Sequence, residues 1–496
     1  MAISAGDNLN SVALPNKLAT AQNYLDFTAA SATEGWGTQY LPEVMEKEAE
    51  VFGNRTVAGF LSKVGAEEAM ASDQVIWSEQ GRLHLCFTGT INTETSVIHI
   101  TNDIDGTGDP AANQPIRVND QVLVAIDDSG VTNTKMCHVQ YVDGDDITAV
   151  PYGAEHWDDF SDVATETSTG TTCTVLVVGS EYGKGSDGPA TSNSPKHKTF
   201  TQKPIILKDK YIINGSDASQ IGWVEVSGED GAGGYLWYLK AEGETRMRFT
   251  DYLEMALLES VIPVSDNTSH VVDAGATNSV ADSLGNNSGH EGLWAAIESR
   301  GNVSTGIDGV NAASDLNEFD AILAEFDKQG AIEENMLFCN RTVSLAVDDM
   351  LASMNSYGAG GTSYGVFDNS EEMALNLGFS GFRRGSYDFY KSDMKYLNDR
   401  GTRGAINDAD STNAIRGCFI PAGVSSVYDQ MLGKNLKRPF LHVRYRASQT
   451  ESRKFKTWIT GSVGAATKDL DAMEVNYLSE RCLVTQGANN FMLLKG

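Results

Sequence analysis

The sequence contains few cysteines, and they lie far from one another. The six are Cys86, Cys137, Cys173, Cys339, Cys418 and Cys482. No two of them form a CxxC pair, the spacing that is typical of zinc ligands and redox motifs. Neither a zinc site nor a disulfide scaffold is therefore indicated, and we expect free, buried thiols.

The sequence also lacks any long apolar segment. Nowhere do about 18 uncharged apolar residues follow one another, which is the length that a membrane-spanning helix requires. The first ten residues, MAISAGDNLN, contain no basic region followed by an apolar one, the pattern of a secretion signal. We therefore expect the protein to stay in the compartment where it is made and to contact no membrane.

Positive charge is scarce. The chain has 37 Lys and Arg residues against 67 Asp and Glu residues, and its formal net charge is −30. This balance argues against a nucleic-acid-binding surface over the whole protein, because neutralising phosphates requires Lys and Arg. An acidic surface instead favours solubility and repels polyanions. The chain is long enough for about three domains, and a hydrophobic content of 41% is enough for buried cores.

The motifs of common enzyme classes are missing or lie in the wrong context. Residues 361–365 read Gly-Thr-Ser-Tyr-Gly, the GxSxG pattern of serine hydrolases, but no apolar strand precedes them to hold Ser363 on a strained turn. The eight histidines form no HExxH motif and no pair at helical spacing. We therefore predict a loop at 361–365, no catalytic residue, no cofactor, no metal site and no enzymatic activity.

One acidic segment resembles a calcium-binding loop. Asp103, Asp105 and Asp109 lie around glycines, and a hard cation prefers several oxygens around a tight turn. The glutamate that such a loop requires at its twelfth position is replaced by Gln114. We expect a solvated turn here, and the sequence leaves open whether a metal ion binds.

The most clearly marked structure lies in residues 315–354. Asp315 can cap a helix that has Glu318 at its third position, and apolar residues then recur at helical spacing. These residues are Phe319, Ile322, Leu323 and Phe326. An apolar run at 336–339 predicts a buried strand, and Asn340 can cap a second helix. Two helices and a strand need a larger sheet to cover, so we expect an α+β core in the second half.

Residues 90–195 are rich in Thr, Val, Asp and Gly and predict a domain of short strands. Residues 116–126, 136–142 and 147–151 have strand character, and Asp143-Gly144 predicts a tight hairpin turn. Glycine- and proline-rich segments flank the region on both sides. We predict a small twisted β-barrel that is inserted into another fold.

A basic cluster stands out at residues 434–456. It holds eight Lys and Arg residues against one acidic residue, Glu451. Such a cluster could bind nucleic acid or pair with acidic residues of a neighbouring subunit. Because the whole chain carries a net charge of −30, we favour the neighbouring subunit. The aromatic residues Trp223, Trp237 and Tyr238 could stack on sugars or bases, but we favour a core or intersubunit contact.

The remaining segments complete the layout. Residues 1–35 combine Ala, Ser, Thr and Asn with scattered apolar residues, so this arm needs another surface on which to pack. Helices are predicted at 41–60 and at 246–260, where apolar residues share one face before Pro263. Strands are predicted at 199–214 and near the C-terminus.

The order of these parts resembles the major capsid protein of tailed bacteriophages, which has the HK97-like fold. The resemblance spans nearly the whole chain and rests on layout rather than on an invariant motif. It implies that residues 65–90 leave the core as an extended loop and that 199–214, with Thr201-Gln202, form its return strand. Residues 246–260 would be the spine helix of the peripheral domain. The long β-rich segment would be an inserted domain, as in some larger members such as crAss-like phages.

The resemblance implies an α+β chain in three parts. Residues 1–64 would form the N-terminal arm and helix. Residues 65–245 would form the extended loop with a β-barrel-like insertion at about 90–195. Residues 246–496 would form helix-rich peripheral and axial domains.

In function, the resemblance implies a shell protein that self-assembles into the hexamers and pentamers of an icosahedral capsid enclosing double-stranded DNA. Its expected partners are copies of itself, the portal, and scaffold, decoration or auxiliary capsid proteins, with assembly in the host cytoplasm. Such a protein needs extended arms whose apolar residues are buried by its neighbours. Two alternatives stand beside it: another virion structural protein of the tail or decoration type, and a β-rich glycan-binding protein.

Overall fold

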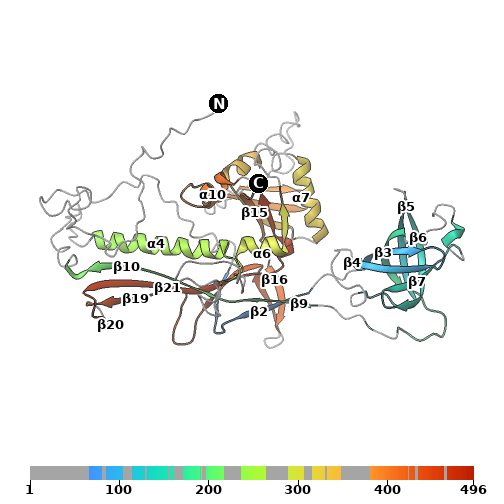
Figure 1. Cartoon of the computed structure of the whole chain (residues 1–496), viewed down its shortest axis with the longest axis horizontal. Coiled ribbons are helices and arrows are strands. Elements are labelled where there is room, and N and C mark those ends of the chain that lie inside the picture. Colours follow the sequence, from blue (N-terminus) through green and yellow to red (C-terminus); the bar gives the residue numbers. More distant parts are fainter. Residues whose placement is uncertain are drawn as a thin grey trace, which may run out of the picture. The chain divides into compact units, whose positions relative to one another are not determined.

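A computed structural model gives the fold of most of the chain outside its N-terminus (Figure 1). It describes residues 66–80, 85–103, 114–128, 131–154, 157–160, 171–189, 192, 197–216, 236–263, 289–305, 316–329, 332–347, 380–410, 412–422, 424–429, 434–462 and 466–496. The chain divides into two compact units. One is Trp77–Phe200, and the other combines Met1–Ile76 with Thr201–Gly496.

The larger unit contains a six-stranded sheet built around one long strand. Its strands are β1 (Ala66–Met70), β10 (Ile205–Asn214), β18 (Leu441–Arg446), β19 (Lys456–Gly461), β20 (Ala466–Thr467) and β21 (Ala472–Thr485). The order is β1-β18-β21-β19-β20, and β10 pairs with β21 along its whole length. Strand β21 therefore has β10 on one edge and both β18 and β19 on the other.

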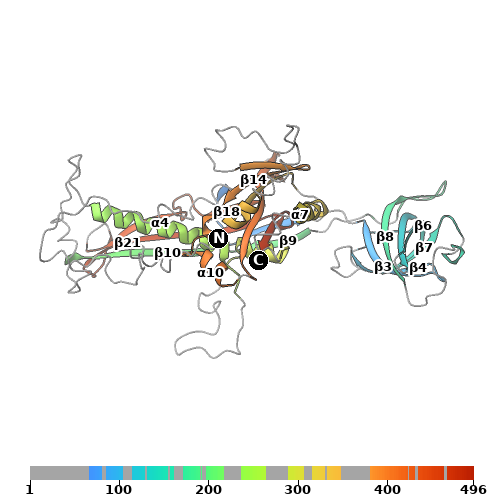
Figure 2. The same cartoon turned by 90° about the horizontal axis from the view of Figure 1, so that it is seen from above.

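Helix α4 (Leu236–Glu259) runs along one face of this sheet over β10 and β21, as Figure 2 shows from above. Phe249 and Leu253 of α4 pack with alternate residues of the two strands, among them Tyr211 and Tyr477. The aromatic rings are in direct contact, with Phe249 and Tyr477 centroids 5.8 Å apart. The apolar stripe read from the sequence at 246–260 is confirmed as the buried face of a helix that begins ten residues earlier.

The second sheet of the larger unit is a central layer that is buried on both faces. Its order is β11 (Asn302–Ser304), β22 (Met492–Lys495), β15 (Ile415–Pro421), β12 (Glu334–Cys339), β14 (Tyr387–Asp393) and β13 (Ser380–Arg384). Leu337 and Cys339 of β12 face one core, whereas Phe338 faces the other. Burial on both sides explains why this strand reads as a continuous apolar run.

Helices cover both faces of this second sheet. Helix α7 (Leu316–Gln329) and the helical segment 341–347 contribute Phe319, Phe326 and Val343 to one core. On the other face lie α6 (Leu293–Arg300), the end of α4, and the 3₁₀ turn η3 (Lys395–Leu397). The short helix α10 (Arg403–Ala409) follows η3, and η4 (Ala488–Asn490) precedes β22. Within the residues given above, no helix is both long and apolar enough to cross a membrane.

The smaller unit contains a closed barrel of six antiparallel strands. They are β3 (Cys86–Asn92), β4 (Val97–Asp103), β5 (Asp120–Asp128), β6 (Val131–Asp143), β7 (Asp146–Pro151) and β8 (Thr171–Ser180). Around the barrel their order is β3-β4-β7-β6-β5-β8. Its interior is filled by alternate apolar side chains and by Trp157 of the turn η1 (Trp157–Asp159), whose Nε1 donates to the Ala149 carbonyl at 3.0 Å.

Two local features of the barrel refine the strand predictions. Residues 116–119 form a turn rather than a strand, because Asn119 has φ +73° and the Arg117 amide donates to the Asp120 side chain. The predicted hairpin turn is present, but its loop is Gly144-Asp145, closed by the pair Asp143 and Asp146. Gly144 has φ +60°, a left-handed conformation that glycine adopts without strain.

Two further strand pairs complete the description. Strands β2 (Val75–Gln80) and β9 (His197–Gln202) form a two-stranded ribbon at the places where the chain passes between the two units. Trp77 of β2 stacks on Phe200 of β9 with ring centroids 5.8 Å apart. Strands β16 (Val424–Asp429) and β17 (Lys434–Pro439) form a hairpin in the larger unit.

The expectation of a helix-rich second half is wrong for the described residues. Strands β11 to β22 hold more of the described residues there than the helices do, and the helices cover the faces of the sheets. The error came from segments such as 434–446, where basic residues hid the strand pattern of β17 and β18. The chain remains a mixed α+β structure. The arm at 1–35, the helix at 41–60, residues 361–365 and the three aromatic side chains lie outside the described residues.

The cap of the helical segment 341–347 provides a test of the local fold. The Val343 amide donates to Asn340 Oδ1 at 2.9 Å, and Asn340 is 4% exposed. We expect Asn340→Ala to lower the free energy of unfolding by about 1 kcal/mol, because a helix amide loses its acceptor. Asn340→Ser keeps a capping oxygen and should cost less. Denaturant titration of both variants measures this, and equal losses would contradict the capping role.

Candidate functional site

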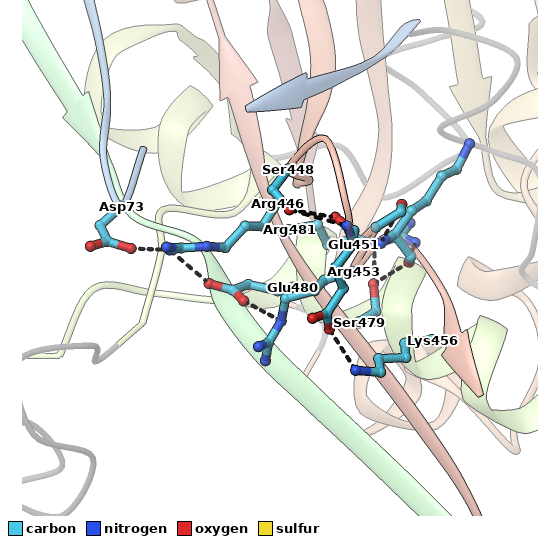
Figure 3. Close-up of polar contacts among 11 residues, drawn as sticks. Asp73, Arg446, Ser448, Glu451, Arg453, Lys456, Ser479, Glu480 and Arg481 are labelled. Atoms are coloured by element: carbon cyan, nitrogen blue, oxygen red, sulfur yellow. Dashed lines mark hydrogen bonds and ion pairs between the residues drawn. The ribbon is translucent and has the colours of Figure 1, made fainter. Parts of the chain in front are cut away.

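The charged residues around strand β1 form the most extensive polar site in the described part of the larger unit. We call this set the charged junction. It comprises Glu67, Glu68, Asp73, Arg444, Arg446, Arg453, Lys454, Ser479, Glu480 and Arg481. Figure 3 labels six of them: Asp73, Arg446, Arg453, Ser479, Glu480 and Arg481. The backbone brings these residues together because β1 runs parallel to β18, and β18 pairs antiparallel with β21.

Glu480 on β21 lies at the centre of the charged junction. Its side chain is 7% exposed and forms ion pairs with Arg453 at 2.7 Å and with Arg446 at 3.5 Å. Arg446 also pairs with Asp73, which lies in the segment between β1 and the ribbon strand β2. One carboxylate therefore links strand β21, the loop after β18 and the start of the excursion towards the barrel.

A second part of the charged junction holds β1 itself. Arg444 pairs with Glu68 at 2.8 Å, and Glu67 pairs with Lys454 and lies 3.7 Å from Arg481. Arg481 also donates to Ser479 Oγ at 2.8 Å and to the Lys454 carbonyl at 2.7 Å. Burial lowers the pKa of Arg481, and the charges of Glu67 and Glu254 oppose that shift. The carboxylates thus compensate a guanidinium that is largely removed from water.

Gln202 fastens the returning strand of the ribbon to the larger unit. Its side chain is 4% exposed, and Nε2 donates to the carbonyl oxygens of Glu291 at 2.8 Å and Leu483 at 3.1 Å. Its Oε1 accepts the Glu291 amide at 3.1 Å. Glutamine is suited to this position because it can donate and accept at once. In the Thr201-Gln202 pair that the sequence analysis named, the buried Gln202 side chain therefore holds the returning strand in place.

His290 directly precedes Glu291, whose backbone Gln202 contacts, and it is buried. Its side chain is fully buried, and neither ring nitrogen has a hydrogen-bond partner among the described residues. Burial lowers the pKa of His290 to about 4. The imidazole is therefore neutral at physiological pH, and its protonation is coupled to unfolding.

Most of the residues that the sequence offered as possible chemical sites are not among the described residues. Asp105 and Asp109 lie outside the described residues, as does the GxSxG segment at 361–365. Among residues that the structure places, no group of three or more His, Cys, Asp and Glu side chains is arranged to hold a metal ion.

The cysteines are free, as the sequence predicted. Five are buried, and Cys86 is half-buried. Burial raises the pKa of Cys137, Cys173 and Cys482 to about 12, which keeps these thiols protonated and unreactive. The thiols therefore act as small apolar side chains.

The interpretation of the basic cluster at 434–456 needs correction. Its described side chains pair with acidic residues of the same chain, rather than standing free for a neighbouring subunit or nucleic acid. Four of them belong to the charged junction, and Lys456 pairs with Glu451 at 2.5 Å. Sequence reasoning missed this because Arg446 and Asp73 are 373 residues apart. The acidic pair Glu67-Glu68 was a signal that the sequence contained. Nothing in the sequence, however, showed which strand lies beside that pair.

In the comparison with known proteins, similarity was found to solved structures. No family model matches the sequence, and no curated protein matches it. Solved structures that are similar include one from Gordonia phage Cozz, with 10% identity, a TM-score of 0.34, and coverage of 96% of this chain and 98% of that one. The capsid of a native GTA particle has 10% identity and a TM-score of 0.34, with coverage of 94% and 98%.

The asymmetric unit of the mature capsid of bacteriophage PhiM1 is also similar, with 11% identity and a TM-score of 0.32 over 64% of this chain and 79% of that one.

Glu480 offers a test of the charged junction. We expect Glu480→Gln to lower the free energy of unfolding by about 2 kcal/mol, because it leaves two partly buried arginines without their shared carboxylate. Glu451→Gln is the matched control. Its side chain is 47% exposed, and its pair with Lys456 is screened by solvent and should contribute little stability. Denaturant titration checks both variants, and equal losses would show that the pairs of Glu480 add no more stability than an exposed ion pair.

His290 generates a prediction about pH. Between about pH 6.5 and 4 the unfolded chain binds a proton at this residue and the folded chain does not, so stability falls as the pH decreases through this window. The full difference amounts to about 3 kcal/mol. We expect His290→Phe to remove this contribution, whereas His99→Gln, at an exposed histidine, should retain it. Thermal unfolding measured across the window checks this, and an unchanged slope in His290→Phe would refute it.

Proposed function

We propose that this chain is the major capsid protein of a tailed bacteriophage and that it self-assembles into an icosahedral shell enclosing double-stranded DNA. In this proposal the larger unit forms the HK97-like peripheral and axial regions. Strands β2 and β9 form the extended loop, and the barrel is a domain inserted into that loop. Hexamers and pentamers of the chain build the shell in the host cytoplasm.

One observation carries the proposal. The long helix α4 and the long strand pair β10-β21 lie beside the place where the chain leaves the larger unit for the barrel and returns from it. Strand β10 pairs residue by residue with β21 from Ile205–Arg481 to Asn214–Ala472, and α4 covers both. The ribbon β2–β9 is anchored by Asp73 at its start and by Gln202 at its return. This order of parts is the one that the capsid resemblance implies for a spine helix and extended loop.

Exposed apolar side chains on this helix and sheet support a role in assembly. Met247 and Tyr252 of α4 are 45% and 42% exposed, and Ile206 of β10 is 43% exposed. Ile76 of the ribbon is 61% exposed. A shell protein buries such residues against its neighbours, which gives them a function that they lack in an isolated chain.

The charge distribution supports a container for DNA better than a DNA-binding protein. The described arginines and lysines of the basic cluster are neutralised within the chain, and the net charge is −30. A wall that bound phosphate tightly would hinder DNA movement during packaging and release. In this proposal the portal and any scaffold, decoration or auxiliary capsid proteins are the other partners.

Assembly of the purified chain tests the proposed function. We expect light scattering and negative-stain imaging to show rings, sheets or closed shells, either from the chain alone or after addition of lysate from the source virus. Deleting residues 1–35 should prevent assembly and leave a soluble chain, because the arm's apolar residues have no other role in the proposal.

Thermal unfolding of the deletion variant serves as the control for folding. A chain that stays monodisperse when it is co-expressed with the other structural genes of its virus would overturn the proposal. Normal shells from the deletion variant would retain the capsid function and remove the arm from the assembly contacts.

A further inference from the structure

The outer face of the barrel carries an apolar row of four residues in register, and Tyr152 extends it. Cys86 of β3 pairs with Leu176 of β8, Leu176 pairs with Leu123 of β5, and Leu123 pairs with Met136 of β6. The row ends at Tyr152, whose amide donates to the Met136 carbonyl at 3.0 Å. We call these five residues the outer row.

The outer row points away from the barrel core. The neighbours of its members along each strand, such as Val122, Val124 and Val175, are fully buried inside the barrel. Because side chains alternate along a strand, the row itself faces outwards. Leu176 and Met136 are each 38% exposed, and Tyr152 is 49% exposed.

The outward row on one side of these residues has a different composition. The next row in register contains Thr134, Ala125, Thr174 and Thr88. Small polar residues are what a solvated barrel exterior needs, so the apolar outer row is a local exception. An apolar surface with methionine and tyrosine and without charged residues is instead typical of the centre of a protein interface.

One end of the outer row is held in place by a polar cluster. The Tyr152 hydroxyl donates to Glu181 Oε2 at 2.6 Å and accepts from Gln121 Nε2 at 3.0 Å. Gln121 Nε2 also donates to Glu181 at 2.7 Å. An aromatic ring fixed in this way loses little conformational freedom when a partner covers it. The same cluster places a carboxylate at the rim of the apolar surface.

Charge defines the kind of partner. Residues 77–200 contain 18 Asp and Glu residues and six Lys and Arg residues, a net charge of −12. A second copy of the chain, with its net charge of −30, meets this face with charge of the same sign, and so does the arm at 1–35, which has three acidic residues and one lysine. A basic partner is attracted by the negative charge of the barrel and also makes apolar contact with the outer row.

We propose that the outer row is a docking surface for a separate protein segment that presents alternating apolar and basic side chains. Its apolar residues cover Leu176, Leu123 and Met136, and its basic residues meet the acidic rim at Glu181. This inference does not require the chain to form a capsid, so its failure would leave the proposed function standing.

Peptide binding to the full-length chain tests the inference. The probe is a fluorescent ten-residue peptide of alternating Lys and Leu, compared with Glu-Leu and Lys-Ser peptides of the same length. Fluorescence anisotropy should show that the Lys-Leu peptide binds at least about tenfold more tightly than either control, because only it offers both contacts.

Charge-neutral variants place the binding on the barrel. We expect the double variant Leu176→Gln, Met136→Gln to weaken Lys-Leu binding at least about tenfold. The matched control Thr88→Gln, Thr134→Gln, on the adjacent row, should bind as the wild type does. Tyr152→Ser provides a second variant with the same expected direction, and circular dichroism checks that each variant is folded.

Three outcomes would overturn the inference. Unchanged binding in the Leu176→Gln, Met136→Gln variant would mean that the peptide responds to net charge alone. Self-association that this variant abolishes, measured by analytical ultracentrifugation, would make a second copy the occupant. Preferential binding of a peptide of residues 1–35 would assign the row to the chain's own arm.

Discussion

The larger unit depends on the pairing of strand β21 with its neighbours. This strand accepts β10 on one edge and β18 and β19 on the other, so segments from widely separated parts of the chain meet on it. Its side chains face α4 with Val475 and Tyr477, while Glu480 enters the charged junction. Without the register of β21, neither the cover provided by α4 nor the anchoring of the ribbon would form.

The anchoring of the ribbon combines two kinds of interaction. Its outgoing side is held by ion pairs between side chains on three different segments, and its returning side by the buried amide of Gln202. Ion pairs weaken with salt when they are exposed, whereas a buried amide that satisfies backbone groups does not. Firm attachment at both ends allows a separately folded barrel to be carried without disturbing the core that it leaves. This is the physical requirement for any inserted domain, whatever its partner.

The two units bury their apolar residues in different ways. The barrel closes on itself, so its core is complete without a partner. Its whole surface could therefore be polar, yet the outer row is apolar. In the larger unit, sheets and helices leave Met247, Tyr252 and Ile206 partly exposed on α4 and β10. Apolar surface that no described segment covers occurs in both units. In the proposed function, self-assembly would bury the exposed residues of the larger unit, and in the further inference a basic partner would bury the row on the barrel.

The sequence by itself determined the elements that depend on local pattern. Helix α7, strand β12, the Asn340 cap and the short strands of a barrel could be read from apolar spacing and turn residues, because these signals lie within a few positions. Tertiary structure alone decided the pairing of the basic residues and the strand order. The partners of Arg446 and Glu480 come from strands far apart in the chain, and their meeting depends on sheet register that no local pattern encodes. The same register places Leu176, Leu123 and Met136 in one row.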